Sequence, residues 1–219
     1  MAACSAPDKN CRLCPRLAAF RRKNRQLYPG KFNAPVPAFG SFDSRLLIVG
    51  LAPGLRGANF SGRPFTGDYA GDLLYPTLLK FAFARGAYGR SADDGFELVD
   101  SRVTNAVRCV PPENKPTGEE INTCRNFLES ELSALPRLSA IIALGAVAHS
   151  SILRALGLPA GFARFGHGSH YALTPEKSLR HQVTLIDSYH CSRYNVNTRR
   201  LTAKMFEDVV ALARQYCKL

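Results

Sequence analysis

The sequence lacks an apolar run of membrane-spanning length, and its first 30 residues contain no stretch that resembles a signal peptide. We therefore expect a cytoplasmic protein, in which seven cysteines serve as ligands or free thiols and not as disulfides. Internal repeats, low-complexity tracts and interdomain linkers are also missing. The 219 residues are predicted to form a single domain, 1–219.

Acidic residues are scarce. Seventeen Asp and Glu stand against 29 Lys and Arg, which gives a formal net charge of +12. Such an excess favours a polyanionic partner, because neutralising phosphates releases condensed counterions. A soluble protein that happens to be basic is the alternative that charge alone leaves open.

Short apolar runs alternate with amphipathic stretches after a basic, proline-containing arm over residues 1–40, which carries the run RRKNR at 21–25. The pattern predicts strands at 46–50, 103–107, 140–145 and 183–190. It predicts helices near 71–85, 117–130, 146–156 and 200–216, the second starting at Pro116–Thr117. This alternation is typical of an α/β fold with a mostly parallel sheet between helices.

Polar or small residues mark the ends of three predicted strands. Gly50, Asn105 and His190 each lie at or just past a carboxyl end. Ligands of parallel sheets bind beyond these ends, so we expect the three residues to converge on one cleft.

Four cysteines form two distant pairs. Cys11 and Cys14 lie in CRLC, and Cys109 and Cys124 follow about a hundred residues later, separated from each other by fourteen residues. Thiolates held at one point suit zinc or an iron–sulfur cluster, and spacing alone does not choose between them. We assign no metal role to the remaining cysteines, Cys4, Cys191 and Cys217.

Three motifs carry a resemblance to a known family. They are GLAPG (50–54) continuing through ANFSGRPFTGD (58–68), TNAVRCVPPENKPT (104–117) and SYHCSRYNVNTRRLT (188–202). In this order, and with these cysteines, the chain resembles the family 5 (type B) uracil-DNA glycosylases from Cys11 to about Thr202. The resemblance implies a three-layer α/β/α sandwich around a four-stranded, mostly parallel sheet.

The resemblance also implies a [4Fe–4S] cluster on Cys11, Cys14, Cys109 and Cys124, with a structural role. It implies a monofunctional enzyme, acting as a monomer in the nucleoid, that hydrolyses uracil from double-stranded or single-stranded DNA and tolerates hypoxanthine and xanthine. The base would be flipped into a pocket.

Three residues are candidates to bind the flipped base. Phe65 matches the position expected to stack on it, although an ordinary core phenylalanine is the alternative. Asn105 can read a Watson–Crick edge with one acceptor and two donors, or it can be a satisfied turn residue. His190 can donate a hydrogen bond to the base carbonyl, or it can be structural. Gly50, Leu51 and Ala52 complete the predicted substrate-binding set.

The residue that activates water is less evident. Leu51–Ala52–Pro53 has no polar side chain where other superfamily members place one, as is typical of family 5. Asp68, at the family's equivalent position, is the candidate base or cation stabiliser. Its alternative role is a helix N-cap, and the two roles are compatible.

The last motif resembles a loop that enters the minor groove. Arg193 or Tyr194 is the candidate wedge, and a solvated basic loop is the alternative. Cys191 stands where proline is common and Arg199 where glycine is frequent. The DNA-binding candidates are Ser192, Arg193, Tyr194, Asn195, Asn197, Thr198, Arg199 and Arg200.

Two other functions remain open. One is a relative restricted to uracil, as in family 4, against which the apolar residues 51–52 argue. The other is a non-catalytic iron–sulfur protein that senses damaged DNA, which would not need Phe65, Asn105 and His190 together.

Overall fold

The computed structural model describes residues 5–159, 161–174 and 179–218. Its helices are α1 Pro15–Leu27, α2 Ala58–Ser61, α3 Tyr69–Lys80, α4 Gly118–Ser133, α5 Ala146–Ala155, α6 Arg193–Asn197 and α7 Ala203–Cys217, with a 3₁₀ turn at Pro112–Asn114. Its strands are β1 Phe39–Gly40, β2 Leu46–Gly50, β3 Ala84–Arg85, β4 Glu97–Leu98, β5 Ser101–Asn105, β6 Ala140–Leu144, β7 His170–Leu173 and β8 Val183–Ser188.

The main sheet has six strands in the order β1-β5-β2-β6-β8-β7. Its four inner strands are parallel, and β1 and β7 pair antiparallel at the edges. The α/β class is confirmed. The predicted four-stranded sheet corresponds to the parallel part, and the full sheet is wider by two edge strands. These strands carried no signal, because β1 has two residues and β7 is largely exposed.

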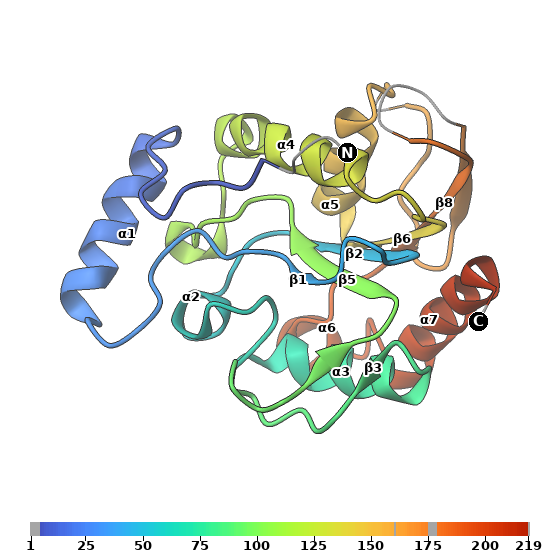
Figure 1. Cartoon of the computed structure of the whole chain (residues 1–219), viewed down its shortest axis with the longest axis horizontal. Coiled ribbons are helices and arrows are strands. Elements are labelled where there is room, and N and C mark those ends of the chain that lie inside the picture. Colours follow the sequence, from blue (N-terminus) through green and yellow to red (C-terminus); the bar gives the residue numbers. More distant parts are fainter. Residues whose placement is uncertain (1–4, 160, 175–178, 219) are drawn as a thin grey trace.

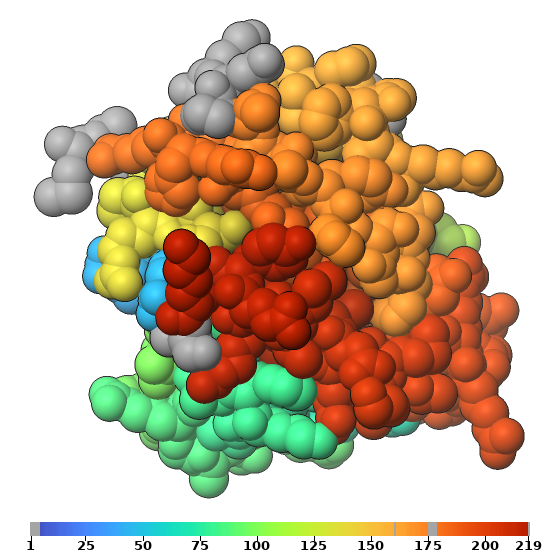
Figure 2. Space-filling model, turned by 90° about the vertical axis from the view of Figure 1, so that its right-hand side faces the viewer, coloured from blue at the N-terminus to red at the C-terminus, as the bar shows by residue number. Residues whose placement is uncertain are grey.

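Helices cover both faces of the sheet, α4 and α5 on one side and α3 and α7 on the other (Figure 1). In β2 every residue is buried, and successive side chains point to opposite faces. Leu46 and Ile48 join the core beneath α3 and α7, whereas Leu47 and Val49 join the core beneath α4 and α5. Figure 2 shows α7 in red lying against α3 in green, with the segment around β7 and β8 in orange above them.

Hydroxyl and carboxyl side chains cap the N-termini of α3, α4 and α7. Thr117 and Glu120 form a reciprocal capping box at the start of α4, which confirms the predicted helix start. Thr202 caps α7 by accepting a hydrogen bond from the Met205 backbone N–H at 3.2 Å. No helix within the described ranges is long and apolar enough to span a membrane.

The N-terminal arm contains a helix that the sequence reading missed. In Figure 1, α1 lies at the left of the molecule, away from the sheet. The run 21–25 lies within α1, and its first arginine, Arg21, is only 4% exposed. A small third core of Leu17, Val107 and Cys124 joins the arm to the rest of the fold.

A buried carboxylate links α4 to β5. Glu131 is fully buried, and its Oε1 accepts a hydrogen bond from Arg102 Nε at 2.6 Å while Oε2 pairs with Arg108. Burial alone would raise the pKa of Glu131, but the charges of Arg108 and Arg102 lower it below its usual value. Glu131 is therefore ionised at neutral pH and compensates two buried cations.

Glu131→Gln is expected to destabilise the fold strongly, because it leaves two buried guanidinium groups without a counter-charge. Removing one partner of a buried pair costs about 3–5 kcal/mol. Urea unfolding measures the difference. The control is Asp208→Asn, which breaks the exposed pair with Lys204 and should change stability little. Equal unfolding midpoints for the two variants would contradict the assignment.

Candidate functional site

Strand register brings the predicted strand ends together. Gly50 pairs with Asn105 across β2 and β5, and Leu144 pairs with Ser188 across β6 and β8. His190 follows β8 by two residues. A β-carbon on Gly145, just past β6, would lie 3.9 Å from His190 Cβ. The carboxyl ends of all four parallel strands therefore meet at one edge.

Gly50 lies between two of the candidate side chains. A β-carbon at this position would be 2.5 Å from Asn105 Oδ1 and 2.5 Å from Phe65 Cζ. No real β-carbon tolerates such contacts, so any larger residue would displace the amide or the ring. The glycine lets Phe65 and Asn105 approach each other at the end of β2.

The Phe65 ring also faces His190. Their ring centroids are 5.9 Å apart, with 31° between the ring planes. Phe65 has φ +52°, a left-handed conformation that is strained for an aromatic residue. The structure thus brings Phe65, Asn105 and His190 together, and it holds Phe65 in a conformation that local preference disfavours.

The GRPF loop is held by a network that the sequence reading missed. The Arg63 guanidinium binds both carboxylate oxygens of Asp94 at 2.8 Å, and it lies 5.6 Å from the centre of the Tyr75 ring. The Tyr88 hydroxyl donates to the Phe65 carbonyl at 3.2 Å. Asp94 lies 31 residues beyond Arg63, so no local pattern reveals the pair. These contacts offset the strain at Phe65.

Asn105 carries an unused acceptor. The residue is 3% exposed, and its Oδ1 is buried with no hydrogen-bond partner among the described residues. Leaving such an atom unpaired costs about 1–3 kcal/mol. A ligand that offers a donor at this point would recover that free energy.

His190 is neutral at physiological pH. Burial lowers the pKa of its imidazole to about 4. A neutral ring can donate one hydrogen bond and accept another. The site therefore offers a donor without a positive charge beside Phe65.

Asp68 caps α3, as the alternative interpretation predicted. Its Oδ1 accepts a hydrogen bond from the Gly71 backbone N–H at 3.3 Å. A β-carbon on Gly57 would lie 2.4 Å from Oδ2, which places the carboxylate against the first motif. Burial raises the pKa of Asp68, partly opposed by the backbone hydrogen bonds of Gly71 and Ala70. A carboxylate in this position can serve as a base.

Leu51 extends the ladder of β2 by one residue. The Val107 backbone N–H donates to the Leu51 carbonyl at 2.9 Å, and that of Ala106 donates to the Gly50 carbonyl at 2.9 Å. Ala52 packs against the small core that contains Val107 and Cys124. The first motif thus runs between the site around Phe65 and the cysteines.

The segment 192–200 begins with the short helix α6. Tyr194 is 71% exposed, whereas the Arg193 guanidinium lies 5.4 Å from the centre of the Tyr69 ring. Asn195 Nδ2 donates to the His190 carbonyl at 2.9 Å. The helix therefore positions the candidate wedge Tyr194 outward and also anchors the backbone of His190.

Residues 197–200, at the end of this segment, are exposed. Arg200 lies 4.5 Å from the centre of the Tyr189 ring, and Arg199 adopts φ +57°, the conformation that glycine favours. Ser192 caps α6, and Thr198 Oγ1 donates to the Tyr194 carbonyl at 2.7 Å. Asn197 is exposed. Arg199 and Asn197 therefore remain accessible to a partner.

All four paired cysteines line one pocket. Cys14 precedes α1, Cys109 follows β5 and Cys124 lies on α4. The Arg108 backbone N–H lies 3.4 Å from Cys124 Sγ, in position to donate. Burial raises the pKa of Cys14 to about 11 and that of Cys109 to about 12. Any metal centre here would have to displace those protons.

The four thiols share one pocket, although no group of three or more His, Cys, Asp or Glu among the described residues is arranged to hold a metal ion. Four thiolates suit zinc or an iron–sulfur cluster. Cys191 and Cys217 are buried elsewhere, and Cys4 lies outside the described residues.

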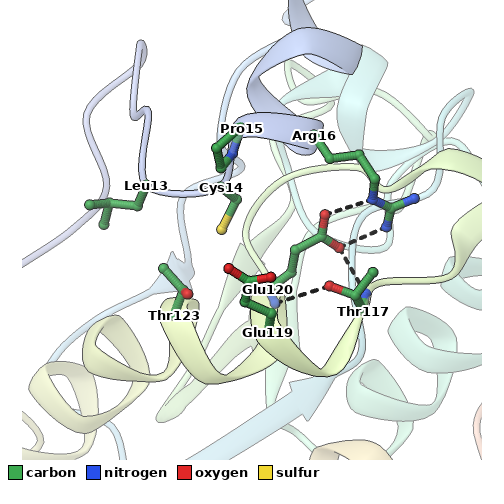
Figure 3. Close-up of a pocket in the computed structure, with 8 residues that line it drawn as sticks. All are labelled: Leu13, Cys14, Pro15, Arg16, Thr117, Glu119, Glu120 and Thr123. Carbon is green, nitrogen blue, oxygen red and sulfur yellow. Dashed lines mark hydrogen bonds and ion pairs between the residues drawn. The ribbon is translucent and has the colours of Figure 1, made fainter.

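An ion pair attaches the arm beside this pocket. Arg16 Nε donates to Glu120 Oε1 at 2.8 Å, and Glu120 is also the capping-box residue of α4. Figure 3 shows this pair next to Cys14, whose sulfur points toward α4. The contact brings the first cysteine pair to the helix that carries Cys124.

Comparison with known proteins gives consistent matches. The sequence profile of the uracil DNA glycosylase superfamily matches residues 37–214. The type-5 uracil-DNA glycosylase of Thermus thermophilus is 42% identical over 214 residues, 95% of this chain and 94% of that protein. That of Pyrobaculum aerophilum is 38% identical over 211 residues, 93% of this chain and 88% of that protein. A type-4 uracil-DNA glycosylase of Pyrobaculum aerophilum is 34% identical over 151 residues, 68% of this chain and 62% of that protein.

The pKa of His190 is expected to lie near 4 instead of the ordinary 6.5. Between pH 4 and pH 6.5 the His190 imidazole binds a proton in the unfolded chain but not in the folded protein. The stability contributed by the neutral ring is therefore complete above about pH 6.5 and falls as pH drops toward 4. Proton NMR of the imidazole, assigned with His190→Asn, measures the midpoint. A midpoint at or above 6.5 would show that the ring is not desolvated as described.

Proposed function

The chain belongs to the uracil DNA glycosylase superfamily, among its type-5 members, and we propose that it hydrolyses the N-glycosidic bond of uracil in DNA, leaving an abasic site. The unpaired Oδ1 of Asn105, buried beside Phe65, is the observation that carries this proposal. Within one domain, the residues at the strand ends supply what the reaction needs.

Asn105 and Phe65 bind the extruded base. Uracil presents an N3–H donor between two carbonyl oxygens, which complements an amide with one acceptor and two donors. The Phe65 ring offers a face for stacking. Extrusion of the base costs a few kcal/mol, and pairing the orphan acceptor returns part of that cost.

His190 stabilises the leaving group. Negative charge grows on the base carbonyls as the bond breaks, and a neutral imidazole donates a hydrogen bond to one of them. One such preorganised donor is worth about 10²–10³ in rate. Because the ring is uncharged, its role is that of a hydrogen-bond donor instead of a counter-cation.

Asp68 positions the attacking water. Its Oδ1 accepts the hydrogen bond that caps α3, and its Oδ2 lies beside Gly57. Attack by water needs no lysine nucleophile, so the enzyme is monofunctional. Since Leu51 and Ala52 add no polar reader, the pocket also accepts hypoxanthine and xanthine.

The exposed segment that begins at Ser192 contacts DNA. Tyr194 fills the space left by the flipped base, and Arg199 and Asn197 contact phosphates. The net charge of +12 supports binding to this polyanion. Asn195 contributes indirectly, through its hydrogen bond to the His190 carbonyl.

The four cysteines around the pocket hold a [4Fe–4S] cluster. Cys11 and Cys14 bind it from the arm, and Cys109 and Cys124 bind it from the body of the fold. The cluster supplies a cross-link between these segments, with no part in the hydrolysis. Iron and sulfide analysis of purified protein tests this assignment.

Purified, iron-replete protein is expected to convert uracil-containing duplex into abasic product, revealed by cleavage in alkali. Asn105→Ala should lower kcat/KM about 100-fold or more, because the base edge loses its partner. Duplexes with hypoxanthine and xanthine define the substrate range. A wild-type protein that binds the DNA but yields no abasic product would instead indicate a non-catalytic damage sensor.

Two substitutions at Asp68 separate its roles. Asp68→Asn keeps an oxygen for the α3 cap but removes the charge, so we expect near-normal stability and a rate about 100-fold lower or more. Asp68→Ala should additionally lose about 1 kcal/mol of stability. Thermal unfolding and single-turnover kinetics measure the two effects. Full activity of Asp68→Asn on all three bases would leave Asp68 as a cap alone.

A further inference from the structure

One buried arginine has no acidic partner in the part of the chain that the structure describes. Four arginines among the described residues are buried: Arg21, Arg63, Arg102 and Arg108. Arg63 pairs with Asp94, and Arg102 and Arg108 share Glu131. The ion pairs found in the described ranges do not include Arg21.

The contacts of Arg21 span both cysteine pairs. Its Nη2 donates to the Cys11 carbonyl at 2.6 Å, and its Nη1 donates to Cys109 Sγ at 3.4 Å. Its Nε is buried and finds no hydrogen-bond partner within residues 5–159, 161–174 and 179–218. Arg21 also lines the pocket that the four thiols surround. The guanidinium therefore lies where the arm and the segment after β5 meet.

The charge of Arg21 indicates that a group of opposite charge occupies this pocket. An unpaired buried charge costs several kcal/mol, and native proteins compensate it with a charge of opposite sign. Neutral thiols do not provide that charge. A metal centre held by four thiolates is a net anion, and it would neutralise the guanidinium.

We propose that Arg21 is the buried counter-ion of the thiolate metal centre and the clamp that joins its two cysteine pairs. The inference rests on the [4Fe–4S] assignment made above. Arg21 supplies a positive charge, a hydrogen bond to the Cys109 sulfur and a hydrogen bond that fixes the backbone of Cys11. It is a positioning residue, whose hydrogen bonds run to Cys11 and Cys109.

Two measurable properties follow. Outer-shell partners of a metal centre change its retention by about 10- to 100-fold. Nearby positive charge and hydrogen bonds to sulfur also favour the reduced form of a cluster, so loss of Arg21 lowers the reduction potential. A residue that only packed α1 against the fold would not change the potential.

The arm keeps other attachments when Arg21 is replaced. The Arg16–Glu120 pair does not involve the Arg21 guanidinium, and Leu17 packs with Val107 and Cys124. Arg22, the next residue, is exposed and provides a matched control.

The experiment compares full-length wild type, Arg21→Met, Arg21→Lys and Arg22→Met, purified without oxygen. Iron and sulfide per chain, the loss of visible absorbance in excess EDTA, and a redox titration are measured. We expect Arg21→Met to lose its cluster about 10- to 100-fold faster than wild type and to have a lower potential. Arg21→Lys should be intermediate, because an ammonium keeps the charge but not the forked geometry. Arg22→Met should match wild type.

Equal rates and potentials for wild type and Arg21→Met would overturn the proposal. If Arg21→Met does not fold, the test uses Arg21→Lys. A rate of cluster loss and a potential equal to those of wild type in Arg21→Lys would then refute the clamp. Wild-type protein that holds zinc refutes only the [4Fe–4S] assignment, and Arg21 is then judged by the rate of zinc release to a chelator. Wild-type protein that holds neither metal refutes both.

Discussion

Gly50 pairs with Asn105 across the parallel strands β2 and β5, and the architecture of both centres depends on this register. The ladder continues beyond the strands through Ala106 and Val107, so it also positions the segment that leads to Cys109. A slip of one residue would turn the Asn105 side chain to the other face of the sheet. It would also move Gly50 out of the position in which its lack of a side chain lets Phe65 and the Asn105 amide approach each other. Base site and cysteine pocket therefore share one constraint, although they lie on different sides of the first motif.

Buried ion pairs stabilise the segments that this register brings together. Arg63 and Asp94 brace the loop in which Phe65 adopts its strained conformation, and Glu131 secures the strand and the following segment through Arg102 and Arg108. The Arg63–Asp94 pair supports the loop of Phe65, and Glu131 supports the strand that ends at Asn105. Such supports hold a binding residue in position before the ligand arrives, which reduces the entropy lost on binding. Their cost is desolvation, which is offset by the pairing of Arg63 with Asp94 and of Arg102 and Arg108 with Glu131.

The sequence was informative wherever a local pattern determines structure. Fully buried parallel strands appear as apolar runs, and the capping box of α4 is visible at Thr117 and Glu120. The convergence of Gly50, Asn105 and His190 followed from the rule for carboxyl ends. Other features depend on partners distant in sequence. Arg21 belongs to the basic run of the predicted arm, and its burial requires α1 to dock on the cysteine pocket. Likewise, the low pKa of His190 is a product of packing, which no motif encodes.

The small third core has a consequence for local stability. The two large cores lie on either face of the sheet, whereas the buried part of the third consists, among the described residues, of Leu17, Val107 and Cys124. So little apolar burial contributes only a few kcal/mol. The arm should therefore open as a separate cooperative unit, with faster amide exchange than the strands. Such opening would expose Cys11 and Cys14 to solvent while the sheet stays folded.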